Sequence, residues 1–183
     1  KLFADIIKTS NIIDIQIFNY EKMNIENYNN LLMSASFWKS LLAENILIFQ
    51  TDSLLVESID FSLFNYDYIG APFCKGKSRS VKFPLFSEDL KVEVGSTWAT
   101  QYFNEELKMG ILMGNGGLSI RNRSKMEEIC LNEKSKANES EDIYFSHFIS
   151  KYSKKLAPIT TVRRFAIEAE YFPSIGFHGS YFY

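Results

Sequence analysis

The chain has 183 residues, of which 46% are apolar and 23% charged, and these values suit one globular domain with a hydrophobic core and exclude an intrinsically disordered chain. A net charge of −2 gives no electrostatic basis for binding nucleic acid. No apolar run reaches the length of a transmembrane helix and no signal peptide is apparent, so we expect a cytoplasmic protein without a transmembrane segment.

The first 45 residues are predicted to be mainly helical. Periodicity and capping residues predict the end of a helix at 3–8, a strand at 12–18, and helices at 25–33 and 37–42. Ser34 or Ser36 is expected to cap the last of these helices.

The middle of the chain is predicted to contain two strands and a long loop. Residues 46–49 form a short apolar run, which is typical of a strand buried on both faces. A second strand is predicted at 66–70, where Gly70-Ala-Pro indicates a chain reversal. Residues 73–97 lack a clear period and are predicted to form a long loop, which in a small domain is more often functional than idle.

The last third alternates strand and helix. A strand is predicted at 117–121, and Ser124-Lys-Met-Glu127 has the pattern of a capping box that opens a helix reaching about residue 131. A second helix is predicted from an acidic entry at 138–142 to about residue 152. The alternation predicts the α/β class. The two cysteines, Cys74 and Cys130, have neither metal-binding nor redox spacing, so we expect free thiols.

A polar segment, Gln50-Thr51-Asp52-Ser53, follows the predicted buried strand directly. Ligands of open α/β sheets bind beyond the carboxyl ends of strands, and a carboxylate buried there needs a partner. A divalent cation that holds a diphosphate is one such partner, because Mn²⁺ and Mg²⁺ prefer oxygen ligands. The alternative is that Asp52 caps the next turn with the help of Ser53.

Three glycines stand within four positions in Gly114-Asn115-Gly116-Gly117, just before the strand that ends at Arg121. Without Cβ atoms, they allow a ligand or another backbone segment to approach closely. The alternative is a tight turn before a strand. A nucleotide-binding phosphate loop fits less well, because the lysine and hydroxyl residue of that motif are missing.

Two segments of the C-terminal part carry titratable side chains. Glu141 and Asp142 open an aromatic-rich helix, where one of them could act as a general base, although the helix dipole favours carboxylates there in any case. His178 lies in Gly176-Phe-His-Gly179, and its imidazole could join a carboxylate as a ligand of Mn²⁺. The alternative is a terminal loop that merely folds back.

Six short segments, taken in order, resemble one family. They are Phe-Gln-Thr-Asp-Ser (49–53), Tyr-Asp-Tyr-Ile-Gly-Ala-Pro (66–72), Gly-Asn-Gly-Gly-Leu-Ser-Ile-Arg (114–121), Glu-Asp-Ile-Tyr-Phe-Ser (141–146), Phe-Ala-Ile-Glu (165–168) and Gly-Phe-His-Gly (176–179). From about Ile15 to its C-terminus the chain resembles the glycosyltransferase-like proteins catalogued as domain of unknown function 5672. Each segment alone is a weak signal, but six in order are specific.

The resemblance implies a fold similar to that of GT-A glycosyltransferases. We therefore expect a single catalytic domain over residues 1–183, with a Rossmann-like mixed β-sheet flanked by helices. The first strand of that fold is expected before Lys1.

The resemblance also implies a metal site. Asp52 stands where the last aspartate of the metal-binding Asp-x-Asp motif would be, and Gln50 occupies the first position of that motif, which is a departure from it. His178 matches the C-terminal histidine that completes the site in many GT-A enzymes. Asp52 and His178 are thus expected to bind Mn²⁺ or Mg²⁺.

Further roles follow from the same resemblance. Asp142, or Glu141 beside it, matches the acidic pair that supplies the general base in inverting enzymes. Gly116 and Gly117 match the glycine-rich segment that lines the donor sugar and the acceptor. The substrate-binding residues expected in all are Gln50, Thr51, Asn115, Gly116, Gly117 and Arg121.

Together these roles imply a metal-assisted, inverting glycosyltransferase. Its donor would be a nucleotide sugar, and its acceptor a hydroxyl of a glycan, a lipid-linked compound or a protein. A non-catalytic nucleotide-sugar- or glycan-binding domain is the main alternative, favoured by the departure at Gln50. A metal-dependent phosphate-ester hydrolase would need more clustered His and Asp ligands than two histidines readily provide.

Overall fold

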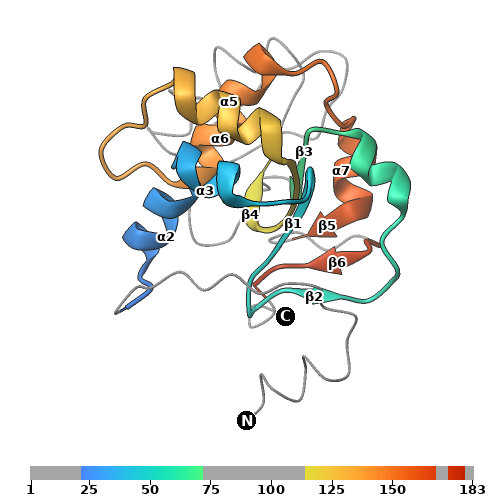
Figure 1. Ribbon diagram of the computed structural model, residues 1–183. Helices are drawn as coiled ribbons and strands as arrows, with labels where there is room; N and C mark the ends of the chain where they lie inside the picture. The colour runs from blue at the N-terminus through green and yellow to red at the C-terminus, as the bar shows by residue number, and fades with distance from the viewer. Residues whose placement is uncertain (1–21, 72–113, 168–172, 180–183) are drawn as a thin grey trace, which may run out of the picture.

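The computed structural model describes residues 22–71, 114–167 and 173–179 (Figure 1). The helix end predicted at 3–8, the strand predicted at 12–18 and the loop predicted at 73–97 lie outside these residues, as does Cys74.

The main sheet has three antiparallel strands in the order β1-β4-β3. Its strands are β1 (Asn45–Phe49), β3 (Tyr68–Ala71) and β4 (Asn115–Asn122). The central strand β4 is almost fully buried, and its side chains alternate between two layers: Leu118 and Ile120 enter one hydrophobic cluster, whereas Arg121 faces the helices on the other side.

The strand predicted at 46–49 exists, but the prediction that both of its faces are buried is wrong. Among the described strands, β1 pairs with β4 alone and lies at one edge of the sheet that they form. Ile46 and Ile48 pack against the helices, whereas Leu47 and Phe49 point the other way and are 36% and 49% exposed. The apolar run is therefore half buried, because no described layer covers its second face.

A second, smaller sheet has the order β2-β6-β5 and consists of two-residue strands. These are β2 (Leu54–Leu55), β5 (Ala166–Ile167) and β6 (Gly176–Phe177). Strand β6 pairs antiparallel with β2 and parallel with β5. The C-terminal segment that contains β6 therefore lies beside the part of the chain that follows β1.

Helices cover one face of the main sheet (Figure 1). They are α2 (Ile25–Leu32), α3 (Ala35–Ser40), α5 (Arg123–Asn132) and α6 (Glu141–Tyr152). Together with Tyr68 they enclose a cluster centred on Trp38, Met126 and Phe145. The opposite face packs against the 3₁₀ helix η1 (Phe61–Asn65), α7 (Ile159–Phe165) and the second sheet, around Leu118 and Phe165.

The predicted capping box at Ser124 is wrong. Helix α5 begins at Arg123, and its N-cap is Asn122, whose side-chain oxygen accepts a hydrogen bond of 2.9 Å from the backbone N–H of Lys125. Asn122 ends β4 in an extended conformation, which is the backbone geometry that an N-cap requires. Ser34, one of the two serines expected to cap α3, is indeed its N-cap residue, although its hydroxyl bonds to the hydroxyl of Ser36 rather than to a backbone N–H of the helix.

The described residues form a mixed α/β domain with small open sheets, as the alternation of elements predicted. None of its described helices is long and apolar enough to cross a membrane.

Candidate functional site

Pairing between β2 and β6 brings Asp52 and His178 together although 126 residues separate them. Leu54, the first residue of β2, lies opposite Phe177, the last residue of β6. In antiparallel strands the residues before one position lie beside those after its partner, so Asp52 and His178 meet at the same end of this sheet. The backbone N–H of His178 also donates to Ile167 of β5, which fixes the chain after β6.

The imidazole of His178 faces two oxygen-bearing side chains. Its Nε2 lies 3.4 Å from the carboxylate Oδ1 of Asp52 and 3.1 Å from the amide Oε1 of Gln50. The imidazole side chain is 11% exposed and the Asp52 carboxylate 21%, so both are shielded but reachable from solvent. Asp52 and His178, the two side chains expected to bind a metal, therefore converge, and Gln50 lies beside them.

A tight turn holds Gln50 and Asp52 against the start of β4. The backbone N–H of Ser53 donates to the carbonyl of Gln50, which closes the turn. The Ser53 hydroxyl and the N–H of Gln50 both donate to the carbonyl of Gly117, each at 2.9 Å. Ser53 thus supports the turn, as the structural alternative proposed, while Asp52 keeps its carboxylate beside His178.

Gly117 is needed for the position of His178. A Cβ atom at this position would overlap the imidazole ring. A Cβ at Gly116 would in the same way overlap the side chains of Glu141 and Arg121. Both glycines were predicted to let a ligand or another backbone segment approach closely. In the structure, buried polar side chains of the protein itself lie against them.

Substitution of Gly117 by alanine is expected to lower the free energy of unfolding by about 1–3 kcal/mol, because the added methyl group overpacks against His178. In the double variant Gly117→Ala/His178→Ala the ring is gone and the methyl group has room. Urea unfolding should therefore show that the double variant is no less stable than His178→Ala alone. If the stability lost in the double variant equalled the sum of the losses in the two single variants, position 117 would not be in contact with His178.

Arg121 and Glu141 form a buried ion pair between β4 and the start of α6. Two parallel hydrogen bonds join them: Nη1 to Oε2, and Nη2 to Oε1 at 3.0 Å. The guanidinium carbon lies 4.9 Å from the centre of the Tyr68 ring and 5.3 Å from that of Phe145. Burial alone would lower the pKa of Arg121, but the Glu141 carboxylate outweighs it and the pKa rises, so the guanidinium stays charged.

The two carboxylates at the start of α6 differ in their surroundings, because only one of them belongs to this ion pair. Glu141 is 2% exposed and bound to Arg121, and its backbone N–H donates to the side chain of Asn29. Asp142 is partly exposed and accepts a hydrogen bond of 2.8 Å from the N–H of Ile143. Of the two predicted bases, Asp142 is the one that a substrate can reach.

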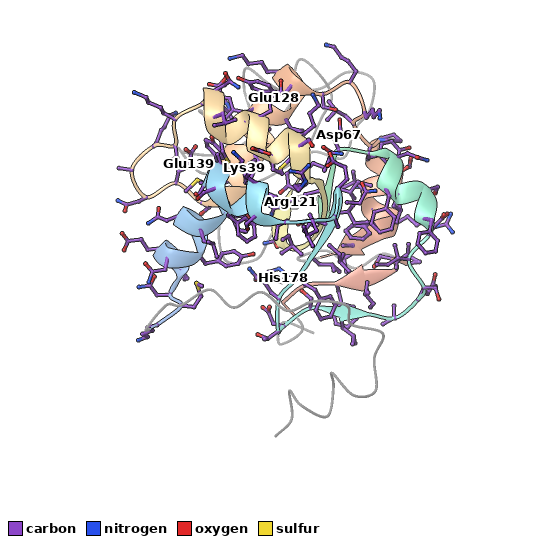
Figure 2. All side chains as sticks on the ribbon, viewed as in Figure 1. Lys39, Asp67, Arg121, Glu128, Glu139 and His178 are labelled. Atoms are coloured by element: carbon purple, nitrogen blue, oxygen red, sulfur yellow. The ribbon has the colours of Figure 1, made fainter. Side chains whose placement is uncertain are left out.

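These residues border one pocket of about 720 Å³, within the range of about 300–1,000 Å³ typical of small-molecule sites. It lies between the starts of α2 and α6, the turn after β1, the start of β4 and His178. Of the predicted site residues, those that line it are Gln50, Thr51, Asp52, Asn115, Gly116, Gly117, Glu141, Asp142 and His178. Arg121 is fully buried behind this wall, so it supports the site and does not line it (Figure 2).

One protein family matches most of the chain. Its description is Protein of unknown function (DUF5672), and it covers residues 12–178. The chain belongs to this family. No curated protein and no solved structure gives a significant match. The family predicted from six segments is thus confirmed, whereas glycosyltransferase activity stays a prediction.

The donor atoms around His178 fit a divalent cation. Carboxylate, amide and imidazole are suitable ligands for Mn²⁺, and carboxylate and amide oxygens for Mg²⁺. Neighbouring ligands of an octahedral ion, each about 2.1 Å from it, lie about 3 Å apart, close to the separations of Nε2 from the oxygens of Gln50 and Asp52. Among the described residues, no group of three or more His, Cys, Asp or Glu side chains could hold a metal ion.

Sequence reasoning missed one wall of the pocket. The additional lining residues are Met23, Asn24, Ile25, Tyr28, Asn29, Phe49 and Ser140. Burial, and then the Glu141 carboxylate, raise the pKa of Tyr28 to about 12, so its phenol stays protonated at neutral pH. Phe49 stood in one of the six segments that resemble the family, but the sequence did not place it beside the start of α2, because a helix start and a strand end reveal no shared pocket until they fold together.

Proposed function

We propose that this protein is a glycosyltransferase of the GT-A type. It would transfer a sugar from a nucleotide-sugar donor to the hydroxyl of a glycan, lipid-linked or protein acceptor in the cytoplasm, with a divalent cation and inversion at the anomeric carbon. One observation carries the proposal: Asp52, Gln50 and His178 meet in the same pocket that Asp142 borders.

The charge of the pocket supports a role for a cation. Asp52, Glu141 and Asp142 line it, and no described lining residue is Lys or Arg; Glu141 is paired with Arg121 behind the wall. A diphosphate would be repelled from such a wall unless a positive ion lay between them. Mn²⁺ or Mg²⁺ held by Asp52 and His178, with Gln50 beside them, would supply charge neutralisation for the departing diphosphate.

Asp142 would serve as the general base. Its carboxylate would accept the proton of the acceptor hydroxyl while the hydroxyl oxygen forms a bond to the anomeric carbon of the donor. The bond from that carbon to the diphosphate oxygen breaks at the same time, and the nucleoside diphosphate leaves. Glu141 would not compete for this role, because Arg121 holds its carboxylate.

A non-catalytic nucleotide-sugar- or glycan-binding domain is the second candidate. Gln50 favours it, because a neutral amide replaces the first carboxylate of the Asp-x-Asp motif and leaves Asp52 as the single carboxylate beside His178. Such a domain would bind its ligand in the same pocket without turnover.

A thermal-shift screen followed by a product assay tests the proposal. Nucleotide sugars are offered singly with Mn²⁺, with Mg²⁺ or with a chelator, since a ligand that binds only the folded state raises the unfolding temperature. We expect one donor to stabilise the protein only with the cation, and that donor to yield a glycosylated acceptor and free nucleoside diphosphate. Cation-dependent stabilisation without product would favour the binding domain, and no stabilisation by any donor would refute both the transferase and a nucleotide-sugar-binding domain.

A further inference from the structure

The pocket has an apolar side that the proposed chemistry does not use. Met23, Ile25 and Phe49 line it and are 48%, 81% and 49% exposed. Phe49 is the last residue of β1, and Met23 and Ile25 flank the N-cap of α2, so two elements far apart in the chain supply this side. Large apolar side chains left in water at the edge of a pocket gain free energy when a ligand covers them.

The polar groups beside these residues suit hydroxyl groups. Asn24, Asn29 and Asn115 supply amides, and Asp142 supplies a carboxylate. The three amide oxygens each accept a backbone N–H, from Asn27, Glu141 and Gly117 respectively, so the amides contribute chiefly N–H donors. The carboxylate contributes acceptors, and together they match the mixed donor and acceptor character of a polyol. The absence of Lys and Arg from the described lining disfavours an anionic group on this side of the pocket.

We infer that Phe49, with Met23 and Ile25, forms the platform of a neutral-sugar subsite. A pyranose ring carries C–H bonds on its faces and hydroxyls around its edge, so its faces suit the apolar side of the pocket and its hydroxyls suit the amides and Asp142 that line the same pocket. Under the proposed function, on which this part of the inference rests, the sugar is the acceptor, because its hydroxyl would then lie beside the general base.

Ligand-observed NMR with simple glycosides tests the subsite. The probes are neutral methyl glycosides of glucose, galactose, mannose and N-acetylglucosamine, with methyl glucuronide as the anionic comparison. We expect at least one neutral glycoside to bind the unmodified protein and the glucuronide to bind more weakly. Phe49→Ala should weaken the affinity for the neutral glycoside by about 5- to 30-fold, as expected for the loss of one ring contact. Phe49→Trp keeps a flat ring and should retain this affinity.

Phe61→Ala is the matched control, because Phe61 is 82% exposed on η1 and does not line the pocket. The inference is overturned if no neutral glycoside binds, if Phe49→Ala binds as well as the unmodified protein, or if Phe61→Ala loses as much. Binding of nucleoside diphosphate with Mn²⁺, measured on the same samples, separates the two proposals: it should survive in Phe49→Ala, and its absence from the unmodified protein would count against the transferase and not against the subsite.

Discussion

Replacing Arg121 by methionine is expected to lower the free energy of unfolding by about 3–5 kcal/mol, because it leaves the buried Glu141 carboxylate without its charged partner. The guanidinium is fully buried, and it also donates to the hydroxyl of Ser119 at 2.9 Å. Urea unfolding at neutral pH measures the loss. The same variant should disturb the pocket, since Glu141 lies next to Asp142 and against Gly116.

Two further variants show whether the stability lost in Arg121→Met comes from leaving a buried charge unpaired or from losing side-chain contacts in general. In Arg121→Met/Glu141→Leu no charge is left unpaired, so most of the stability should return. Arg123→Met removes the ion pairs of Arg123 with Glu44 and Glu127. The Arg123 side chain is 23% exposed, so this variant should lose less than about 1 kcal/mol of unfolding free energy. Equal losses in Arg121→Met and Arg123→Met would show that burial of the pair has no special importance.

Asp142→Asn is expected to reduce the rate of sugar transfer by about 10²- to 10⁴-fold, the typical contribution of a general base, while cation-dependent binding of nucleoside diphosphate stays nearly intact. The amide keeps the size of the carboxylate but cannot accept the acceptor's proton. Single-turnover rates and calorimetric binding, measured on the same protein, give the two quantities.

Asp60→Asn serves as the control for Asp142→Asn. Asp60 is also at a helix start, where its side chain accepts from the N–H of Ser62 at 2.9 Å, but it does not line the pocket. This variant should transfer sugar at the unmodified rate. If Asp142→Asn lost binding and transfer in equal measure, Asp142 would be a cap of α6 and not a base.

The sequence predicted the described helices and strands wherever local periodicity was strong. Helices α2, α5 and α6 and strands β1, β3 and β4 lie within a few residues of their predicted positions. The three two-residue strands were missed, because so short a segment has no period and β6 forms only where β2 and β5 flank it. The cap of α5 was assigned to Ser124 because its spacing to Glu127 fits a capping box, whereas Asn122, already extended at the end of β4, reaches the helix first.

For the site, too, the sequence predicted some features and missed others. Family resemblance singled out the polar residues of the pocket that come from the turn after β1, the start of β4, the start of α6 and the C-terminal segment, but it missed the asparagines of α2. The pairing of Arg121 with Glu141 could not be read from the sequence, since it depends on β4 and α6 packing so that Tyr68 and Phe145 enclose the guanidinium. Gly116 and Gly117 were correctly expected to permit close approach, but which side chains approach is decided by the tertiary fold.

The cation that Asp52 and His178 are proposed to hold would recruit the diphosphate. Calorimetric titration of uridine and guanosine diphosphates, each with Mn²⁺ or with chelator, into the unmodified protein, Asp52→Asn and His178→Gln measures this role. We expect one diphosphate to bind the unmodified protein only with Mn²⁺, and each substitution to weaken this binding by at least about tenfold. Equal binding with chelator, or variants that bind like the unmodified protein, would rule out a cation site at these two residues.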